Sequence, residues 1–290
     1  MSVRAAGTLP ATTAMGPVNL TVADLERSLA YYGDSVGLAV RERGGGRASL
    51  GTGDRELLVL VEEPGAQPAR RSTGLFHFAL LLPGRAHLAR WLAHAGRDRV
   101  PLAGLSDHFV SEAIYLTDPD GHGIEIYSDR PREVWEGRVM TRMTTEPLDV
   151  ASLLSELDDP QNAGFDGLPA GTRMGHVHLQ VASVEDALGF YRDVLGFELM
   201  AELFGSAVFL AAGGYHHHVG ANTWQSLGAS PPPPGSAALR HATIVLPDTA
   251  ERDRVAARVA ETGQEPEAVG EGVLVRDPSG IALLLAAGGG

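Results

Sequence analysis

The residues best able to do chemistry in this chain are its histidines and carboxylates, because the chain contains no cysteine and no lysine. The absence of cysteine excludes disulfides, zinc–thiolate sites and thiol catalysis. The absence of lysine excludes Schiff-base chemistry. Any bound metal would therefore have to use imidazole nitrogens and carboxylate oxygens as ligands.

One carboxylate is singled out by a repeated turn. The sequence Asp-Pro-x-Gly occurs at Asp118–Gly121 and again at Asp277–Gly280. Four residues after the glycine, the first copy has Glu125 and the second has Leu284. Glu125 lies in the apolar run 123–127, where a buried charge would need a partner. The alternative is that Glu125 faces solvent on an edge strand.

The histidines that accompany apolar strands are candidates for that partner. His77 precedes an apolar strand, and His176 and His178 alternate with Val177, so these two share a face. Three consecutive histidines follow at 216–218, and neutral imidazoles near pH 7 can accept or donate protons. A lone histidine of this kind can equally be a satisfied core residue, and a run of three can be a solvated loop.

These residues belong to an internal repeat, the feature to seek first in a chain of this length. Residues 15–40 (MGPVNLTVADLERSLAYYGDSVGLAV) align without gaps on residues 174–199 (MGHVHLQVASVEDALGFYRDVLGFEL). Each copy predicts an alternating strand followed by an amphipathic helix. The expected helix ends are equivalent in the two copies: Asp24 and Ser183 near the start, Gly37 and Gly196 near the end.

A weaker similarity relates residues 77–96 to residues 241–263. The chain is therefore predicted to contain four strand–helix–strands units, at about 15–65, 74–130, 174–225 and 238–287. They group into an N-terminal domain, 1–145, and a C-terminal domain, 146–290. The helix aromatics Tyr31, Tyr32, Phe190 and Tyr191 are expected in the core. The turn residues Asp120 and His122 are expected to be exposed.

The composition limits the classes of partner. With 290 residues and 44% hydrophobic residues, the chain can fold as two globular domains. A net charge of −13 argues against nucleic acid and against an anionic membrane surface. No run of eighteen apolar residues occurs, and the N-terminal residues lack the pattern of a signal peptide, so we expect a cytoplasmic protein. The sequence leaves a homo-oligomer open.

Over residues 15–287, the chain resembles the vicinal oxygen chelate superfamily, and within it the two-domain extradiol dioxygenases similar to catechol 2,3-dioxygenase. The stretch 215–224 (YHHHVGANTW) is similar to one typical of that branch. The extradiol signature has Ser106 as its one departure and otherwise matches at His108, Ile114, Tyr115, Asp118, Pro119, Gly121 and Glu125. The resemblance implies an α+β fold in which four βαβββ units form two pseudo-barrels around a divalent metal.

In the resembled family, ligands come from the first strand of each unit and from the last strand of one of them. The first-strand position holds Pro17, His77, His176 and His241 in units one to four, and Glu125 is the one last-strand carboxylate. Neither half alone therefore has two histidines and a carboxylate. We predict that units two and three pair to form the working barrel, while units one and four form a metal-free support.

The predicted metal ligands are thus His77, His176 and Glu125, a set typical of non-haem Fe(II) sites. Fe(II) is the expected metal and Mn(II) the alternative. His178 remains open as a replacement for His176 or as a neighbour of the ligands, and His241 is expected to be structural.

The resemblance also implies an oxidative ring cleavage of a small aromatic diol by O2. A proton acceptor and donor would be needed. The candidates are His216, His217 and His218, expected on the last strand of unit three, and His108; His218 is preferred, followed by His217. Tyr115 is expected to hydrogen-bond the bound ring oxygen. Two other functions stay open because fold does not fix function. One is another metal-dependent enzyme of the superfamily (an isomerase, lyase or biosynthetic oxygenase), and the other is a protein that sequesters a small molecule and confers resistance.

Overall fold

The computed structural model of the chain describes residues 7–288, and these residues form four units of one strand, one helix and three further strands. Unit one contains β1 (Ala14–Val22), α1 (Leu25–Ala30) continued by the π-helical turn η1 (Tyr31–Val36), β2 (Ala39–Gly44), β3 (Arg47–Thr52) and β4 (Arg55–Glu62). Unit two contains β6 (Gly74–Leu81), α2 (Arg85–Arg97), β7 (Gly104–Asp107), β8 (Ser111–Thr117) and β9 (Gly123–Asp129). The first half of the chain thus holds two βαβββ units.

The second half repeats this order. Unit three contains β11 (Arg173–Gln180), α6 (Val184–Leu188) continued by η2 (Gly189–Leu195), β12 (Glu198–Leu203), β13 (Ala207–Ala211) and β14 (Val219–Asn222). Unit four contains β16 (Leu239–Leu246), α7 (Thr249–Glu261), β17 (Glu267–Val269), β18 (Gly272–Arg276) and β19 (Ala282–Ala287). Short elements join the units: β5 (Gln67–Pro68), α3 (Arg132–Trp135), α4 (Val139–Arg142), β10 (Glu146–Pro147), α5 (Val150–Leu154) and β15 (Ser236–Ala237).

The first helices of units one and three begin and end as predicted. The side chain of Asp24 accepts a hydrogen bond from the Arg27 amide, and Ser183 accepts one from Asp186 in the same way. Each helix then widens into a π-helical turn and ends at a glycine in the left-handed region, Gly37 in unit one and Gly196 in unit three.

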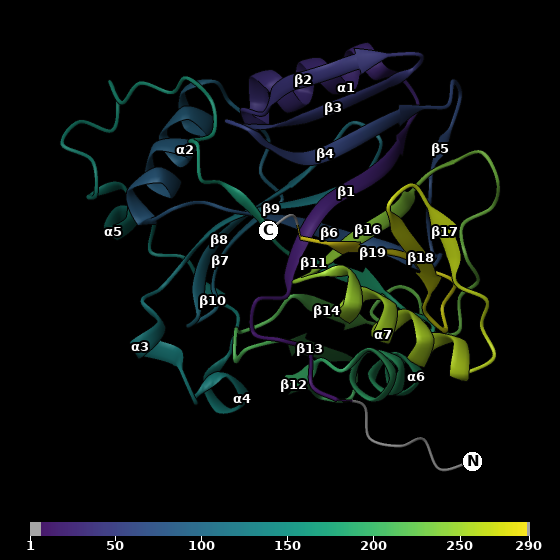
Figure 1. Ribbon diagram of the computed structural model, residues 1–290. Coiled ribbons are helices and arrows are strands. Elements are labelled where there is room, and N and C mark those ends of the chain that lie inside the picture. Colours follow the sequence, from purple (N-terminus) through teal and green to yellow (C-terminus); the bar gives the residue numbers. More distant parts are fainter. Residues whose placement is uncertain (1–6, 289–290) are drawn as a thin grey trace.

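The strands form two large mixed sheets, and each sheet curls into a half-barrel (Figure 1). One sheet has the order β10-β7-β8-β9-β6-β11-β14-β13-β12, so it joins units two and three through the antiparallel pair β6–β11. The other has the order β17-β18-β19-β16-β1-β4-β3-β2 and joins units four and one through β16–β1. The predicted pairing of units two and three is therefore confirmed, and each sheet takes strands from both sequence halves.

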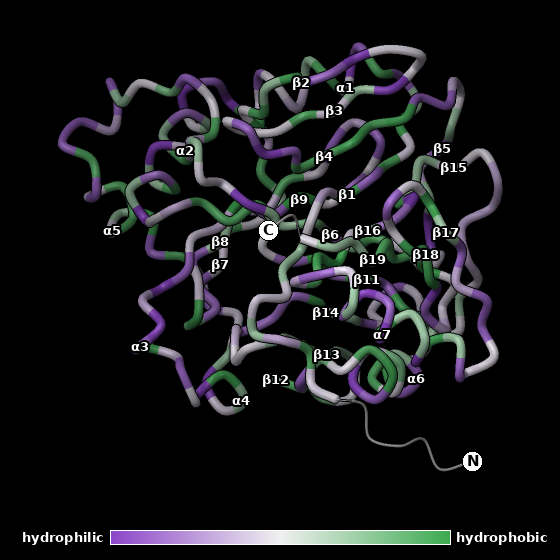
Figure 2. Tube along the Cα trace, viewed as in Figure 1, coloured by the Kyte–Doolittle hydropathy of each residue, from purple (hydrophilic) through white to green (hydrophobic). Residues whose placement is uncertain are grey.

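The core lies between and within these sheets. Hydrophobic residues concentrate along the central strands, whereas hydrophilic residues are frequent in the outer loops (Figure 2). Tyr32, Phe190 and Tyr191 are buried as expected, and Tyr31 is half-buried and packs against the same core. Among the described residues, no helix has the length and apolar character needed to cross a membrane.

The expectation that Asp120 and His122 are exposed is wrong. Both side chains are buried, because the Asp-Pro-x-Gly turn of unit two packs against unit one. Asp120 accepts a hydrogen bond from the Arg27 guanidinium at 2.5 Å, and Nε2 of His122 lies 3.0 Å from the Thr21 carbonyl oxygen. These side chains therefore join the two sheets.

Candidate active site

Three neighbouring strands of the nine-stranded sheet bring His77, Glu125 and His176 together. His77 is on β6, Glu125 is on β9, which runs parallel to β6, and His176 is on β11, which runs antiparallel to β6. Ala79 of β6 pairs with Glu125 on one side and with His176 on the other. The ladder therefore fixes the relative positions of side chains that come from different halves of the chain.

The donor atoms of these side chains form a compact triangle. Nε2 of His77 lies 3.0 Å from Oε2 of Glu125, Nε2 of His176 lies 3.1 Å from the same oxygen, and the two nitrogens are 3.4 Å apart. Three donors on one face of an octahedral ion, each at about 2.1 Å, lie about 3.0 Å from one another. The spacing of the three atoms thus fits facial coordination of a divalent transition metal. Within residues 7–288, this is the one group of three potential metal ligands this close together.

The electrostatics of the triangle also suit a cation. All three residues are buried, and the side chain of Glu125 is only 2% exposed. Burial opposes ionisation of Glu125, but the imidazoles of His176 and His77 outweigh it and hold the pKa of Glu125 well below its ordinary value. Burial lowers the pKa of His176, which keeps its imidazole available as a neutral ligand. A buried carboxylate flanked by two imidazole nitrogens is a donor set suited to a divalent cation.

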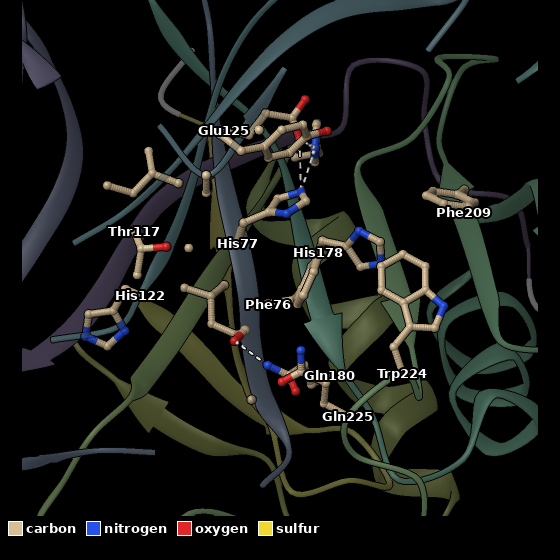
Figure 3. Close-up of a pocket in the computed structure, with 18 of the residues that line it drawn as sticks. Phe76, His77, Thr117, His122, Glu125, His178, Gln180, Phe209, Trp224 and Gln225 are labelled. Atoms are coloured by element: carbon tan, nitrogen blue, oxygen red, sulfur yellow. Dashed lines mark hydrogen bonds and ion pairs between the residues drawn. The ribbon is translucent and has the colours of Figure 1, made fainter. Parts of the chain in front are cut away.

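The triangle opens into a cavity of about 840 Å³. Its walls come from units two and three, with contributions from segments 69–73, 140–145 and 237–239. Figure 3 shows His77 and Glu125 with aromatic side chains beside them. Aromatic residues of the wall on this side include Phe76, His178, Phe209 and Trp224. Such a cavity, mostly apolar with a few converging polar groups, is typical of a small-molecule site.

His178 belongs to this wall and not to the triangle. Its ring centre is 5.1 Å from that of His77 and 5.3 Å from that of Trp224. Burial lowers its pKa well below the ordinary value, so the imidazole is neutral. Gly220, its partner in the β11–β14 ladder, makes room for the ring, because a β-carbon there would lie 2.9 Å from Cγ of His178. His178 is thus placed beside the candidate ligands.

Comparisons with known proteins agree with this architecture. The family model described as "Glyoxalase/Bleomycin resistance protein/Dioxygenase superfamily" matches residues 14–126 and again residues 173–285. The chain belongs to this superfamily. Its two matches coincide with the two repeats found in the sequence.

Individual relatives extend the comparison. A protein named catechol-2,3-dioxygenase from Bacillus subtilis (strain 168) is 43% identical over 274 residues, which cover 92% of this chain and 94% of the relative. The solved structure of a putative dioxygenase from Bacillus subtilis subsp. subtilis str. 168 matches with a TM-score of 0.64 at 13% identity, covering 97% of this chain and 86% of that chain. Glyoxalase I from Zea mays matches with a TM-score of 0.57 at 16% identity, covering 95% and 92%. At these low identities, the two structures support the superfamily fold and nothing finer.

Within the superfamily fold, the three consecutive histidines of this chain point in different directions. They precede β14 instead of lying within it. His217 lines the cavity, and its ring centre is 4.0 Å from that of His176. His218 does not line the cavity: its Nδ1 accepts the Ala212 amide at 3.2 Å, and its ring lies 5.0 Å from that of Tyr215. The preference for His218 over His217 is therefore reversed.

Tyr115 and His108 form a hydrogen-bonded pair at the cavity wall. The Tyr115 hydroxyl lies 2.6 Å from Nε2 of His108, and Nδ1 of His108 lies 2.7 Å from the Thr144 carbonyl oxygen. That carbonyl can only accept, so Nδ1 of His108 carries a hydrogen and Nε2 accepts from Tyr115. Burial and the nearby Glu125 carboxylate raise the pKa of Tyr115 well above its ordinary value. Tyr115 is thus a neutral phenol. It lies opposite Glu125 in the antiparallel ladder between β8 and β9.

His241, the first-strand histidine of unit four, lies in the other sheet. It pairs with Asn19 of β1 and has no carboxylate partner among the described residues, while Leu284 occupies the position equivalent to Glu125. The structure therefore separates His241 from the triangle.

Sequence reasoning missed Asp129 and gave His216 no distinct role. Asp129 accepts a hydrogen bond from His216, whose other nitrogen contacts His217. A signal was present, because Glu125, Tyr127 and Asp129 alternate along β9 and so share one face. The register of 216–218 against that face was what the sequence could not supply.

Proposed function

We propose that this protein is a non-haem Fe(II)-dependent extradiol dioxygenase that cleaves a catechol-like substrate with O2. The observation that carries the proposal is the convergence of His77, His176 and Glu125 on one point of a cavity large enough for an aromatic substrate. The 43% identity to a protein named catechol-2,3-dioxygenase, over nearly the whole of both chains, supports the same activity.

The proposed ligands would hold Fe(II), with Mn(II) as the alternative, through one carboxylate and two imidazoles. A metal held on one face supplies open positions at which a diol and O2 can be brought together. The reaction breaks a ring carbon–carbon bond beside the paired hydroxyls and places both atoms of O2 in the product. The chain's own contribution is to orient the ring, exclude water and move protons.

The side chains around the triangle are suited to those tasks. His217 faces the cavity beside His176 and is neutral, because burial lowers its pKa well below the ordinary value. A neutral imidazole can accept a hydrogen bond from a substrate hydroxyl along the path by which the proton leaves. The Tyr115 hydroxyl, held by His108, can hydrogen-bond a ring oxygen. Phe76 and Trp224, whose ring centres are 5.3 Å apart, offer apolar surface to the ring.

Oxygen dependence tests the proposal directly. The protein is loaded with Fe(II) without air and mixed with a panel of catechols, and absorbance and O2 uptake are recorded when air is admitted. A coloured ring-opened product that forms only after air enters, with about one O2 consumed per product, is expected for a dioxygenase. Tight iron binding with no O2 uptake for any catechol would instead favour a non-oxidative enzyme of the superfamily.

Metal retention tests the ligands independently of turnover. Iron in the purified protein should be lost in His77→Ala, His176→Ala and Glu125→Ala, because two remaining ligands bind a divalent ion weakly. His241→Ala is the matched control, a first-strand histidine in the other sheet, and should retain iron. Retained iron in His176→Ala, or lost iron in His241→Ala, would show that the ligand set is different.

A further inference from the structure

Asp129 is linked to the cavity through two histidines, His216 and His217. It is the last residue of β9, on the same face as Glu125, and its side chain is 22% exposed. Its carboxylate lies 2.8 Å from Nε2 of His216, which is fully buried. Nδ1 of His216 in turn lies 2.9 Å from Nδ1 of His217, the histidine that lines the cavity.

The direction of each hydrogen bond follows from what the groups can donate. A carboxylate only accepts, so Nε2 of His216 carries the hydrogen. Nδ1 of a neutral His216 is then a lone pair, and the hydrogen between the two rings must belong to Nδ1 of His217. Nε2 of His217 is left without a hydrogen, and the hydrogen bond found for this ring within residues 7–288 is at Nδ1.

We propose that Asp129 and His216 are positioning residues that hold His217 in the tautomer whose unprotonated Nε2 faces the cavity. A neutral histidine in water prefers the opposite tautomer, with the hydrogen on Nε2. The chain of two hydrogen bonds therefore presents a hydrogen-bond acceptor to an incoming hydroxyl, where an unassisted histidine would present a donor. This role rests on the proposed function, in which a substrate hydroxyl must give up a proton.

Neighbouring side chains hold Asp129 and His216 in place. The Tyr215 hydroxyl donates to both oxygens of Asp129, at 3.1 and 3.2 Å, and lies 2.8 Å from the Tyr127 hydroxyl. Trp135 packs edge-on against His216, with ring centres 5.5 Å apart, and its indole nitrogen donates to the Arg130 carbonyl. Asp129 thus cannot rotate away from His216 without losing other contacts.

Histidine tautomers can be read directly by ¹⁵N NMR. Spectra of ¹⁵N-histidine-labelled, metal-free protein at about pH 8, where imidazoles are neutral, distinguish hydrogen-bearing from bare ring nitrogens. The signals of His217 are assigned with His217→Gln. We expect hydrogen on Nδ1 and none on Nε2. Hydrogen on Nε2 of His217 in the unaltered protein would overturn the proposal.

Three variants test the series of hydrogen bonds from Asp129 through His216 to His217. His216→Phe keeps a ring but removes the partner of His217, and Asp129→Asn keeps the shape but offers either an acceptor or a donor to His216. Both should move His217 toward the Nε2–H tautomer. Tyr215→Phe is the matched control: it removes another hydrogen bond to the same carboxylate but leaves the bond from His216, so it should change the tautomer less than the first two variants. An unchanged tautomer in both of the first two variants, or an equal change in all three, would contradict the proposal.

Kinetics separate the positioning role from the proposed reaction. For a catechol that is turned over, Asp129→Asn should lower kcat by about 10- to 100-fold, as loss of supporting partners does elsewhere, with KM changed by no more than about twofold. A reversed tautomer with unchanged kcat would overturn the positioning role. If the unaltered protein cleaves no catechol, the proposed function fails, while the NMR result still decides the hydrogen-bond chain.

Discussion

Glu125 and Leu284 occupy equivalent positions in units two and four, and each suits its neighbours. Glu125 lies beside Ala79, whose small side chain leaves room for the imidazoles that flank it. Leu284 lies beside Thr243, whose hydroxyl donates to the Pro17 carbonyl at 2.7 Å. After the same turn, the carboxylate of Glu125 meets two imidazoles in one sheet. In the other sheet the half-buried Leu284 lies beside a threonine that is hydrogen-bonded elsewhere.

The identity of the cavity histidine gives a prediction at the residue scale. His217→Gln should lower kcat for catechol cleavage by about 100- to 10,000-fold, the usual range for loss of a general acid or base. His218→Gln should leave kcat within about twofold of the original, because His218 does not line the cavity. Initial rates of O2 uptake under saturating substrate compare the two. Equal losses would mean that the neighbouring histidines act through structure alone.

At the scale of elements, β11 carries the features that set the site. Its ladder with β6 is interrupted by a register shift between Met174 and His176, where Gly175 stands. A β-carbon at Gly175 would overlap the Tyr127 hydroxyl, so only glycine lets that phenol cross toward Tyr215. The ladder, the close approach and the position of the His176 side chain thus depend on one another.

Gly175→Ala should therefore destabilise the protein by about 1–3 kcal/mol, the usual cost of overpacking a well-packed interior. Gly189→Ala is the matched control, because no atom lies within 4 Å of a β-carbon there and the residue is helical. That variant should be neutral or more stable by up to about 1 kcal/mol. Urea denaturation compares the free energies of unfolding. A Gly175→Ala protein as stable as the control would contradict the packing argument.

Sequence reasoning reached this scale unevenly, for physical reasons. The four units, the caps at Asp24 and Ser183 and the pairing of units two and three followed from repeat length, local hydrogen bonding and a count of ligands. The directions of the His217 and His218 side chains could not be predicted, because residues in a loop before a short strand do not point alternately to the two faces of the sheet. The burial of Asp120 depended on contacts with a different unit, which no local pattern records.

At the scale of the whole molecule, both sheets are shared between the sequence halves. The nine-stranded sheet joins units two and three, and the eight-stranded sheet joins units one and four. A half of the chain on its own would leave the edge of a first strand unpaired in each sheet, exposing backbone donors, acceptors and apolar side chains. The arrangement makes each half dependent on the other.

Residues 1–145 and 146–290 expressed separately should thus fail to unfold cooperatively and should not retain metal, since neither contains the β6–β11 pair. Co-expression of the two pieces should restore both properties. Calorimetry and metal analysis are the measurements. A single half that shows a sharp unfolding transition would argue for autonomous domains.

The pH dependence of stability provides another whole-molecule prediction. Burial raises the pKa of Asp277 to about 6, although hydrogen bonds from Ile281, Ser279 and Tyr191 oppose the shift. The unfolded chain releases this proton near pH 4, whereas the folded protein holds it to about pH 6. Protonated Asp277 therefore adds up to about 3 kcal/mol to the free energy of unfolding below about pH 4. This contribution is lost as the pH rises through about 6.

Asp277→Asn should remove this part of the pH dependence, because the amide oxygen still accepts from the backbone and carries no titrating proton. The free energy of unfolding at pH values of about 4 and about 7 is compared for both proteins. The unaltered protein should lose more stability than the variant over this interval. Parallel losses would place the titrating group elsewhere.

The positions of the three grouped side chains also bear on how the chain comes apart. His77 and His176 are 99 residues apart in sequence, and Glu125 lies between them. An ion bound by all three side chains would close two large loops at once. It would therefore restrict the unfolded chain much as a cross-link does. Removing the ion should then lower the free energy of unfolding as well as abolish the chemistry, because the two loops regain their freedom in the unfolded chain.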